Sequence, residues 1–331
     1  MYYCSMCLIV KNEAEYLAEW INYYQLIGVE HFYIYDNNSN PPLKSVLQPY
    51  IDKGLVTYHY DTRTIVQTHV YNDCIRNHGK DNTWLGFFDT DEFLVLKQHT
   101  QVRDFLQNYE QFGALSIPWY LFGSNGHERK PKSQIYAYTK HHVKSCHYKT
   151  MVRPERIKDF NIHNVNEHMP GYYTVDETKQ QVSGPFTMRQ CSEFAQLNHY
   201  VVRSKEEFLQ KVARGGPDGS RKPPEFFDLT NNQPMVDDFT IIDNIDKYFE
   251  PFSYLLYNPD LAKISATIAF AKRHWLEHGK QEQRQFYPLI AFNWVNYVQR
   301  YPDLQQAGID NADKAIAHYI HHGQNEGRKC D

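Results

Sequence analysis

The first 120 residues alternate short apolar runs with amphipathic stretches, and this alternation limits the fold more than any other feature of the sequence. The apolar runs, which are typical of buried strands, are Tyr2–Val10, His31–Tyr35, Leu55–Tyr60, Trp84–Phe88 and Ala114–Tyr120. Between the first two runs, aromatic and aliphatic residues spaced four apart predict a helix that Asn12 caps and Gly28 ends. Strands that alternate with helices favour parallel β-α-β units. We therefore expect an α/β fold with a doubly wound, mostly parallel sheet.

Polar residues follow three of the predicted strands at their carboxyl ends. Lys11-Asn12-Glu13 follows the first, Asp36 ends the second, and Asp89-Thr90-Asp91 follows the fourth, which we expect to continue into Glu92-Phe93-Leu94. Open α/β sheets bind ligands where loops leave the carboxyl ends of the strands. We expect the binding site at this edge of the sheet.

Composition and charge narrow the class of protein. The chain has 331 residues, with 39 acidic and 35 basic side chains and a net charge of −4, which argues against a nucleic-acid partner or a polybasic membrane anchor. No apolar run is long enough for a transmembrane segment, and the first residues lack the basic leader of a signal peptide. The six cysteines include Cys4 and Cys7, which lie in an apolar run with no second pair nearby, and this argues against zinc and favours a reducing, cytoplasmic location.

The second half of the chain differs from the first. Strand-like pieces cover Gln134–Val143 and Tyr148–Val152. Ser204 and Glu207 form a capping box that predicts a helix over Lys205–Arg214, and residues 216–235 have the prolines of a loop. We expect a catalytic domain over 1–246 and an α-helical appendage over 247–331.

The appendage contains an internal repeat. Tyr254–Leu261 matches Tyr297–Leu304, and each is followed by a His-aromatic pair, a glycine and a Glu-x-Arg unit. We expect two helical hairpins, over 254–284 and 297–328, with their aromatics as core and the Glu and Arg of each unit as local ion pairs. Because one hairpin cannot bury its own apolar face, the copies would pack on each other, on the main domain or on a second subunit, which allows a homo-oligomer.

Asp89 and Asp91 are the first candidates for chemistry. A D-x-D sequence at the end of an apolar strand places two carboxylates on one side of the departing chain. Such hard oxygen ligands suit Mn²⁺ or Mg²⁺, which would also bind the diphosphate of a nucleotide. The alternative is a pair of ordinary loop aspartates, since short motifs occur by chance.

Asp36 is a candidate for base recognition. A carboxylate at a strand end can accept a hydrogen bond from the N3–H of uracil. The neighbouring Asn37, Asn38 and Ser39 leave open that Asp36 is a turn residue instead.

In combination, these segments resemble a known family. The run from Cys4 to Ser39, the segment Phe87–Leu94 and the segment Trp119–His127 are similar to family-2-like and family-92-like glycosyltransferases over roughly residues 3–215. The resemblance implies the GT-A fold, a Rossmann-like nucleotide-binding domain with a metal bound by D-x-D. It also implies inverting sugar transfer from a nucleotide sugar, most often UDP-linked, to a glycan or lipid-linked acceptor.

The resemblance also assigns roles to residues. Asp89 and Asp91 would bind the metal and diphosphate, with His199 completing the metal shell. Asp36 and Lys11-Asn12-Glu13 would lie against the nucleotide. The loop residues Gly123, Ser124, Gly126 and His127 would lie beside the donor sugar and the acceptor.

The chemistry of several side chains agrees with these roles. Gly123 and Gly126 allow close approach of backbone N–H groups to a sugar or phosphate. Trp119 and Tyr120 offer flat faces to an acceptor ring, or else simply pack in their strand. Further candidates to neutralise a diphosphate are Lys149, Arg153, Lys205 and Lys211.

Inverting transfer also needs a carboxylate to accept the proton of the acceptor hydroxyl. The candidates between the glycine loop and the late histidine are Glu128, Asp176, Glu177 and Glu193. We favour Glu128 because it adjoins the glycine loop. Two other functions stay open: a nucleotidyltransferase, against which the lack of a glycine-rich loop after the first strand counts, and a catalytically inactive carbohydrate- or partner-binding protein.

Overall fold

The computed structural model describes residues 1–64, 66–142, 146–186, 191–216, 218–282, 284–286, 289–290 and 292–330. The chain divides into two compact units, Met1–Asn244 and Ile245–Asp331, two residues before the predicted boundary. None of the described helices is long and apolar enough to cross a bilayer. The cytoplasmic location inferred from the sequence stays a prediction.

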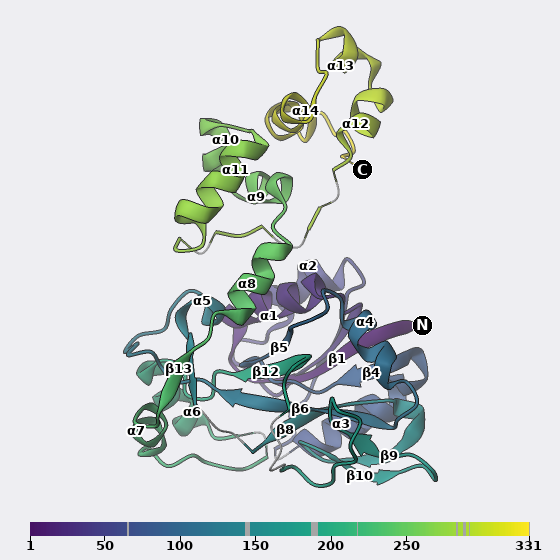
Figure 1. Cartoon of the computed structure of the whole chain (residues 1–331), viewed down its shortest axis with the longest axis vertical. Coiled ribbons are helices and arrows are strands. Elements are labelled where there is room, and N and C mark those ends of the chain that lie inside the picture. The colour runs from purple at the N-terminus through teal and green to yellow at the C-terminus, as the bar shows by residue number, and fades with distance from the viewer. Residues whose placement is uncertain are drawn as a thin grey trace. The chain divides into compact units, whose positions relative to one another are not determined.

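A nine-stranded sheet, counted over the described residues, forms the centre of the first unit (Figure 1). Its strands are β1 (Tyr2–Val10), β2 (His31–Asp36), β3 (Val56–Tyr60), β4 (Asn82–Gly86), β5 (Glu92–Leu96), β6 (Ala114–Leu121), β8 (Tyr148–Val152), β11 (Thr174–Val175) and β12 (Ala195–His199). The order is β3-β2-β1-β4-β8-β6-β12-β5, with β11 beside β6. Strands β1 to β4 are parallel, whereas β8 and β5 run antiparallel to their neighbours. The predicted α/β class with a mostly parallel sheet is therefore confirmed.

Helices lie on both faces of this sheet, with α1 (Ala14–Leu26) on one face and α3 (Gln67–His78) on the other. The first unit also contains α2 (Lys44–Ile51), α4 (Val102–Leu106), α5 (Gln134–Ala137), α6 (Lys205–Arg214) and α7 (Phe226–Asn231), and α8 (Thr240–Lys247) begins in it. Short 3-10 helices span Gly79–Asp81, Gln107–Tyr109 and Pro154–Arg156, and two small ladders pair β7 (Lys140–His142) with β13 (Met235–Asp237) and β9 (Ile157–Phe160) with β10 (Val165–His168).

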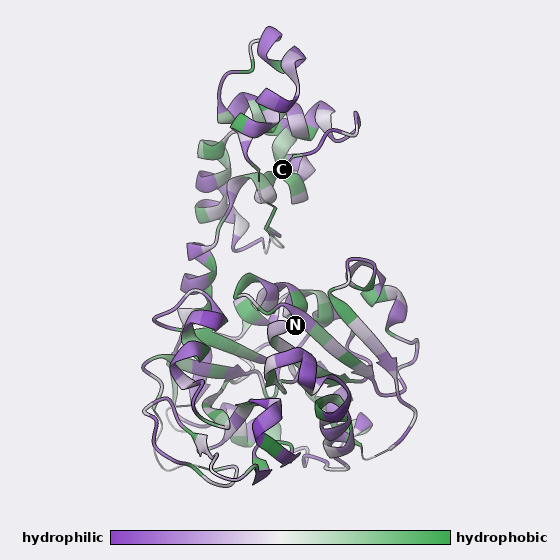
Figure 2. Ribbon diagram, turned by 90° about the vertical axis from the view of Figure 1, so that its right-hand side faces the viewer, coloured by the Kyte–Doolittle hydropathy of each residue, from purple (hydrophilic) through white to green (hydrophobic). Residues whose placement is uncertain are grey.

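The alternation of side chains along the strands decides which helix packs where. Trp20 of α1 lies against Phe32 of β2, with ring centroids 5.5 Å apart. On the opposite face, Tyr71 of α3 packs with Tyr33 and Tyr35 in one buried cluster. Because successive strand residues point to opposite faces, both faces of β2 are apolar and buried. Figure 2 shows hydrophobic residues concentrated along these strands.

Several local predictions were wrong, among them the loop over residues 216–235, which contains helix α7 and the first residue of β13. The strand before Asp89 does not continue into Glu92-Phe93-Leu94: β4 ends at Gly86, and β5 is a separate strand that pairs antiparallel with β12. The segment from Gln134 begins as helix α5, because Ser133 caps it, and only Lys140–His142 is strand; Val143 lies outside the described residues. Asn12 does not cap α1, because Glu13 occupies the N-cap position. The capping box of Ser204 and Glu207 on α6 is confirmed.

The second unit consists of two copies of one small motif. The first copy contains α9 (Pro251–Tyr257), α10 (Pro259–Ile264) and α11 (Ile268–His274), and the second contains α12 (Trp294–Arg300), α13 (Pro302–Gln306) and α14 (Ala312–His318). The π-helices Trp275–Gly279 and Tyr319–Gly323 extend α11 and α14. Each copy thus has three short helices where a hairpin was predicted, because Pro259 and Pro302 each start a new helix.

The same tyrosine–histidine contact occurs inside each of the two copies. Tyr254 donates to or accepts from His274 at 2.8 Å, and Tyr297 meets His318 at 2.9 Å. The predicted aromatic core is confirmed for Tyr254, Trp275 and Tyr297, while Tyr319 packs partly buried against it. The predicted pairs of Glu282 with Arg284 and of Glu326 with Arg328 are also confirmed.

Candidate functional site

A cavity of about 490 Å³ lies at the carboxyl ends of the parallel strands. It is lined by Asn37, which follows β2, by Thr64, and by Gln67 at the start of α3. It is also lined by the turn Asp89–Asp91 and by His199 at the end of β12, and the Tyr71 hydroxyl links Gln67 to Asp89. The predicted edge of the sheet therefore does contain a cavity that collects polar residues from several strands.

Two lysines hold the two aspartates of the D-x-D sequence. The Nζ of Lys149 lies 3.0 Å from Asp89 Oδ2, and the Nζ of Lys211 lies 2.7 Å from Asp91 Oδ2. Burial alone would raise the pKa of Asp91, but the charge of Lys211 holds it well below its usual range. Asp91 is therefore an anion in the folded protein.

His199 lies beside Asp91. Its Nε2 is 3.7 Å from Asp91 Oδ2, and burial is the main cause that lowers its pKa to about 4. The imidazole is therefore neutral at pH 7, which is the form that binds metals. Its Nδ1 lies 4.0 Å from the buried Glu92, whose pKa burial raises to about 8.

The residues in the cavity fit a divalent ion that is bound partly by protein side chains and partly by the phosphates of a substrate. Mg²⁺-like ions at nucleotide sites are held by one or two carboxylates together with phosphate oxygens, not by a complete protein cage. Asp91 and His199 converge, and Asp89 is in the same turn, although Asp89 is drawn toward Lys149. The described part of the chain has no group of three or more His, Cys, Asp or Glu side chains arranged to hold an ion, so Asp89, Asp91 and His199 do not form a complete metal site by themselves.

The cavity also collects cations that suit a diphosphate. Lys211 and Arg214 come from α6, and Arg221 and Lys222 from the loop that follows it. Burial, followed by the charge of Lys211, lowers the pKa of Lys222 to about 8. Two of the predicted phosphate-binding cations lie elsewhere: Arg153 pairs with Glu155, and Lys205 pairs with Glu128.

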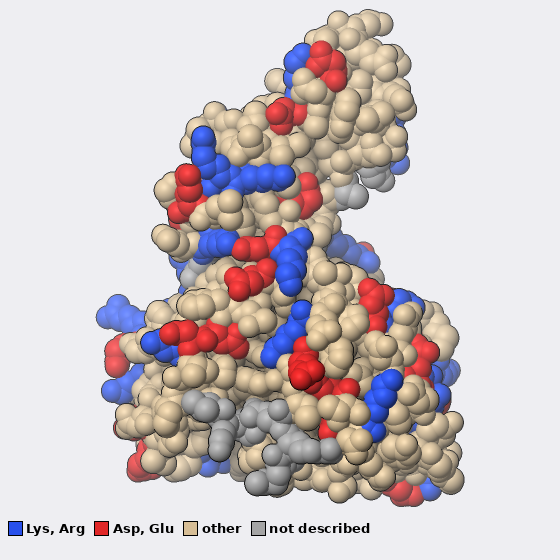
Figure 3. Space-filling view, viewed as in Figure 1, with Lys and Arg blue, Asp and Glu red and all other residues tan. Residues whose placement is uncertain are grey.

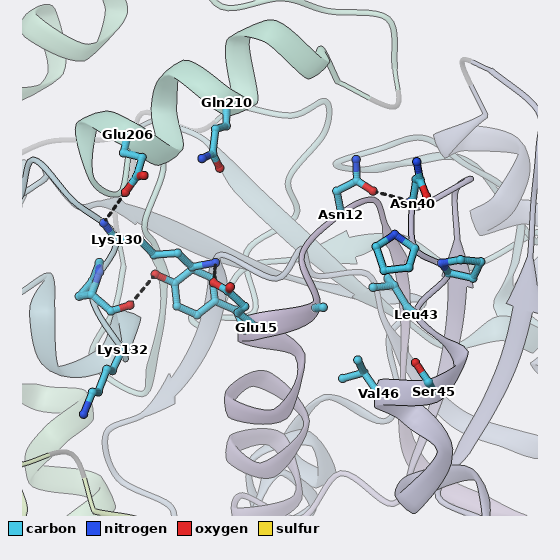
Figure 4. A pocket seen from close by; sticks show the side chains of 15 residues that line it. Asn12, Glu15, Asn40, Leu43, Ser45, Val46, Lys130, Lys132, Glu206 and Gln210 are labelled. Atoms are coloured by element: carbon cyan, nitrogen blue, oxygen red, sulfur yellow. Dashed lines mark hydrogen bonds and ion pairs between the residues drawn. The ribbon is translucent and has the colours of Figure 1, made fainter.

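The segment after β1 is divided between two cavities. Lys11 and Glu13 line the cavity of Asp91, whereas Asn12 lines a neighbouring one of about 740 Å³, in which its side chain accepts a hydrogen bond from the backbone of Asn40 (Figure 4). Arg214 separates the two by donating to the Lys11 carbonyl at 2.6 Å and to Glu13 at 2.7 Å. Asn12 therefore does not face the D-x-D carboxylates.

Asp36 is a turn residue in this structure. Its side chain is fully buried, and its oxygens accept hydrogen bonds from the backbone N–H groups of Ser39 and Leu43 and from the Tyr58 hydroxyl. The Asp36 carboxylate is therefore turned toward its own turn and Tyr58, and it is not among the residues that line the cavity. The next residue, Asn37, lines the cavity instead.

The predicted glycine loop also lies away from the aspartates. Ser124, Gly126 and Glu128 line a separate cavity of about 400 Å³. Gly123 packs against Met235, where a Cβ would lie 2.5 Å from the methionine methyl, and the His127 ring lies edge-on to Tyr138. The loop is therefore packed against β13 and does not approach the D-x-D turn.

The favoured base is poorly placed for chemistry. The Glu128 side chain is 74% exposed and lies 3.8 Å from Lys205. The alternatives are no better: Asp176 accepts three local hydrogen bonds, Glu177 accepts from the backbone of Phe194 and Ala195, and Glu193 is exposed on the surface. None of the four lines the cavity of Asp91.

Trp119 and Tyr120, the two aromatic candidates, lie on opposite faces of the sheet because neighbouring strand residues point to opposite faces. Trp119 lines the cavity, packs on His199 with centroids 4.3 Å apart and meets His163 edge-on. Tyr120 points to the other face, where its hydroxyl contacts Ser192.

The sequence reasoning missed several cavity residues. The main omission is the loop Gly215–Lys222, whose described residues line the cavity, and the others are His163 and Gln67. The loop Gly215–Lys222 has the sequence Gly-Gly-Pro-Asp-Gly-Ser-Arg-Lys, which combines glycines with basic residues next to a helix end. That combination is the signal that could have identified the loop.

Comparison with known proteins identifies the first unit. The model of Glycosyltransferase family 92 matches residues 1–211, and the chain therefore belongs to that family. A family 92 protein of Oryza sativa subsp. japonica is 30% identical over 213 residues, and one of Ricinus communis is 28% identical over 218; the matches cover 63% of this chain in both cases. They cover 35% and 37% of those proteins, so the chain spans little more than a third of the relatives it matches.

Two further proteins are similar over different extents. The galactan beta-1,4-galactosyltransferase GALS3 of Arabidopsis thaliana is 30% identical over 129 residues, which are 35% of this chain and 26% of that protein. Among solved structures, residues 1–349 of S. aureus TarS match with a TM-score of 0.37 and 11% identity, covering 99% of this chain and 93% of that one. A similarity at that level carries no inference about function.

Proposed function

We propose that this family 92 chain transfers a sugar from a UDP-linked donor to a hydroxyl group of a lipid-linked or soluble glycan, with galactose as the first candidate sugar. The observation that carries the proposal is the convergence of Asp91, the neutral imidazole of His199 and the ammonium of Lys211 in one cavity. A carboxylate with an imidazole suits Mn²⁺ or Mg²⁺, and the ammonium suits a phosphate oxygen. The galactosyltransferase relatives support the choice of sugar.

The side chains that line the cavity suit both parts of such a donor. Asn37, Thr64 and Gln67 offer amide and hydroxyl groups of the kind that pair with a nucleobase and ribose. The diphosphate would lie beside Lys211 and Lys222. When bound, a divalent ion held by Asp89, Asp91 and His199 would neutralise the charge of the diphosphate leaving group.

Side chains of this protein would stabilise the leaving group and contact the sugar ring. A β-linkage made from an α-linked donor requires inversion, a single displacement at the anomeric carbon. Lys211, Lys222 and Arg221 are placed to stabilise the negative charge that develops on the departing diphosphate. The face of Trp119 offers the sugar ring an apolar surface.

A donor panel tests the proposal. The full chain is incubated with Mn²⁺ and each of several nucleotide sugars, and release of nucleoside diphosphate is measured with and without a galactan acceptor. We expect turnover with UDP-galactose, loss of turnover in EDTA and its return when Mn²⁺ is added back. Binding of Mn²⁺ in the presence of UDP, followed by electron paramagnetic resonance, should weaken in Asp91→Asn.

Each alternative function gives a different result in this test. A nucleotidyltransferase would release pyrophosphate from a nucleoside triphosphate and a sugar phosphate. An inactive carbohydrate-binding protein would bind galactan by calorimetry but turn over no donor. Turnover by UDP-galactose that EDTA leaves unchanged would contradict the proposed metal.

A further inference from the structure

Four rings contact one another in a row across the sheet, and we call His199, Trp119, His147 and Phe186 the aromatic row. His199 ends β12, Trp119 lies in β6, and His147 directly precedes β8; in the sheet, β6 lies between the other two strands. Phe186 forms an antiparallel bridge with His147. The ring centroids are 4.3 Å apart from His199 to Trp119, 5.4 Å from Trp119 to His147 and 4.6 Å from His147 to Phe186.

The aromatic row leads from the donor cavity to the surface. His199 and Trp119 line the cavity, and Trp119 is 9% exposed. His147 is half-buried, and Phe186 is 56% exposed; neither is among the residues that line the cavity. The exposure of the rings therefore increases with each step away from the proposed metal site.

Hydrogen bonds fix the outer part of the aromatic row. The backbone N–H of Trp119 donates to the carbonyl of His147 at 2.9 Å. The hydroxyl of Tyr148 donates to the carbonyl of Gly184, two residues before Phe186. The Phe186 ring meets the His147 ring at 67°, edge to face. The rings thus form a surface that exists before a ligand binds, which lowers the cost of ordering it.

The chemistry of this surface suits an uncharged sugar chain. Burial lowers the pKa of the His147 imidazole, which is therefore uncharged at pH 7 like the rings beside it. A pyranose can pack its C–H groups on such rings while its hydroxyl groups stay in water. On the face of the first unit that Figure 3 shows, acidic and basic side chains are interspersed, a mixture that suits a neutral polymer better than a polyanion.

We propose that His147 and Phe186 bind the sugar units of the acceptor that adjoin the reacting one, an inference that rests on the proposed function. The unit that carries the reacting hydroxyl would lie beside Trp119, next to the donor sugar. The adjoining units would pack over His147 and Phe186. The acceptor is therefore a chain of neutral hexopyranoses, because a single sugar beside Trp119 does not reach Phe186.

Phe186→Ala tests the inference, because the exposed ring can be removed without opening the core. With UDP-galactose, the KM for a β-1,4-linked galactose tetrasaccharide should rise about three- to tenfold, as for loss of one aromatic contact, while kcat stays near the wild-type value. The KM for free galactose and the affinity for UDP should not change. Calorimetry with the tetrasaccharide, in the presence of UDP and Mn²⁺, should show a weakening of binding by the same factor.

Two further variants serve as controls. Phe186→Tyr keeps the ring and should bind the tetrasaccharide within about twofold of the wild type. Phe239→Ala removes a phenylalanine that is 50% exposed and lines none of the cavities described above, and it should leave every measurement unchanged.

Three results would overturn the inference. The first is an unchanged KM for the tetrasaccharide in Phe186→Ala, and the second is an equal rise in the KM for free galactose. The third is a dimer in sedimentation that Phe186→Ala dissolves, which would make the ring a contact between two chains. A wild type that binds the tetrasaccharide through Phe186 but turns over no donor would overturn the proposed function and leave the sugar-binding surface standing.

Discussion

Arg203 donates a hydrogen bond to Glu13 at 2.8 Å, across 190 residues of sequence. Both side chains are buried, and Arg214 and Thr90 donate to the same carboxylate. The contact joins the turn after β1 to the two ends of helix α6. Because Lys211 and Arg214 reach the cavity from α6, this contact ties the helix that carries them to the turn after β1.

Glu13→Gln should therefore destabilise the first unit. Removing one partner of a buried ion pair leaves the other charge uncompensated, which costs about 3–5 kcal/mol. Urea unfolding at pH 7 measures the change. The control is Glu15→Gln, whose side chain is 72% exposed, and it should change the free energy of unfolding by less than about 0.5 kcal/mol. Equal stability of the two variants would contradict the structural role of Glu13.

The same carboxylate predicts how stability depends on pH. Burial favours the neutral acid, but Arg203 and Arg214 hold the pKa of Glu13 at about 2, against 4.5 for an ordinary glutamate. Since the folded pKa is the lower one, the stabilisation is complete above pH 4.5 and is lost as the pH falls toward 2. Between pH 5 and pH 3 the loss should be about 2 kcal/mol in the wild type and absent from Glu13→Gln, as measured by unfolding. Parallel pH profiles would assign the acid sensitivity to other groups.

Asp91→Asn should abolish transfer without unfolding the chain. The neutral amide weakens both the pairing with Lys211 and the proposed metal site, so we expect a loss of more than about 100-fold, as for removal of one key electrostatic group. Circular dichroism checks the fold, and Asp104→Asn, an exposed aspartate on α4, serves as the control. Near-normal transfer in Asp91→Asn would remove the D-x-D turn from the mechanism.

Asp36→Asn should affect stability and leave UDP affinity unchanged. The amide nitrogen would face a backbone N–H or the Tyr58 hydroxyl, and a mismatched buried donor costs about 1–3 kcal/mol. Thermal unfolding and UDP calorimetry are measured together, with the exposed Asp52→Asn as control. A variant of normal stability that loses UDP affinity would restore Asp36 to the nucleotide site.

Tyr254→Phe and Tyr297→Phe should have matched effects on the second unit. Each removes the hydroxyl that pairs with His274 or His318 and keeps the ring in the core, at a cost of about 0.5–1.5 kcal/mol. Hydrogen exchange should speed up in the repeat that carries the change, while sugar transfer stays at the wild-type rate. Loss of transfer in either variant would show that the second unit takes part in catalysis.

Sequence patterns predicted the structure correctly wherever residues close to one another in the chain determine it. The limits of β1, the capping box of α6 and the ion pairs of Arg284 and Arg328 all depend on residues close to one another in the chain or on period-two and period-3.6 patterns. The break between β4 and β5 was missed because apolar residues stand on both sides of the D-x-D segment, and the antiparallel pairing of Glu92–Leu96 with β12 is what makes it a separate strand.

The sequence by itself determined the α/β class, the edge of the sheet that holds the site, and the D-x-D turn with its late histidine as candidate ligands. Tertiary structure alone decided which other polar groups reach that edge. It buried Asp36 in hydrogen bonds, packed the loop of Gly123 against Met235, and brought the loop of Asp218 into the cavity. The physical reason is that a carboxylate's role depends on which cations and N–H groups surround it, and those partners come from segments up to 190 residues away.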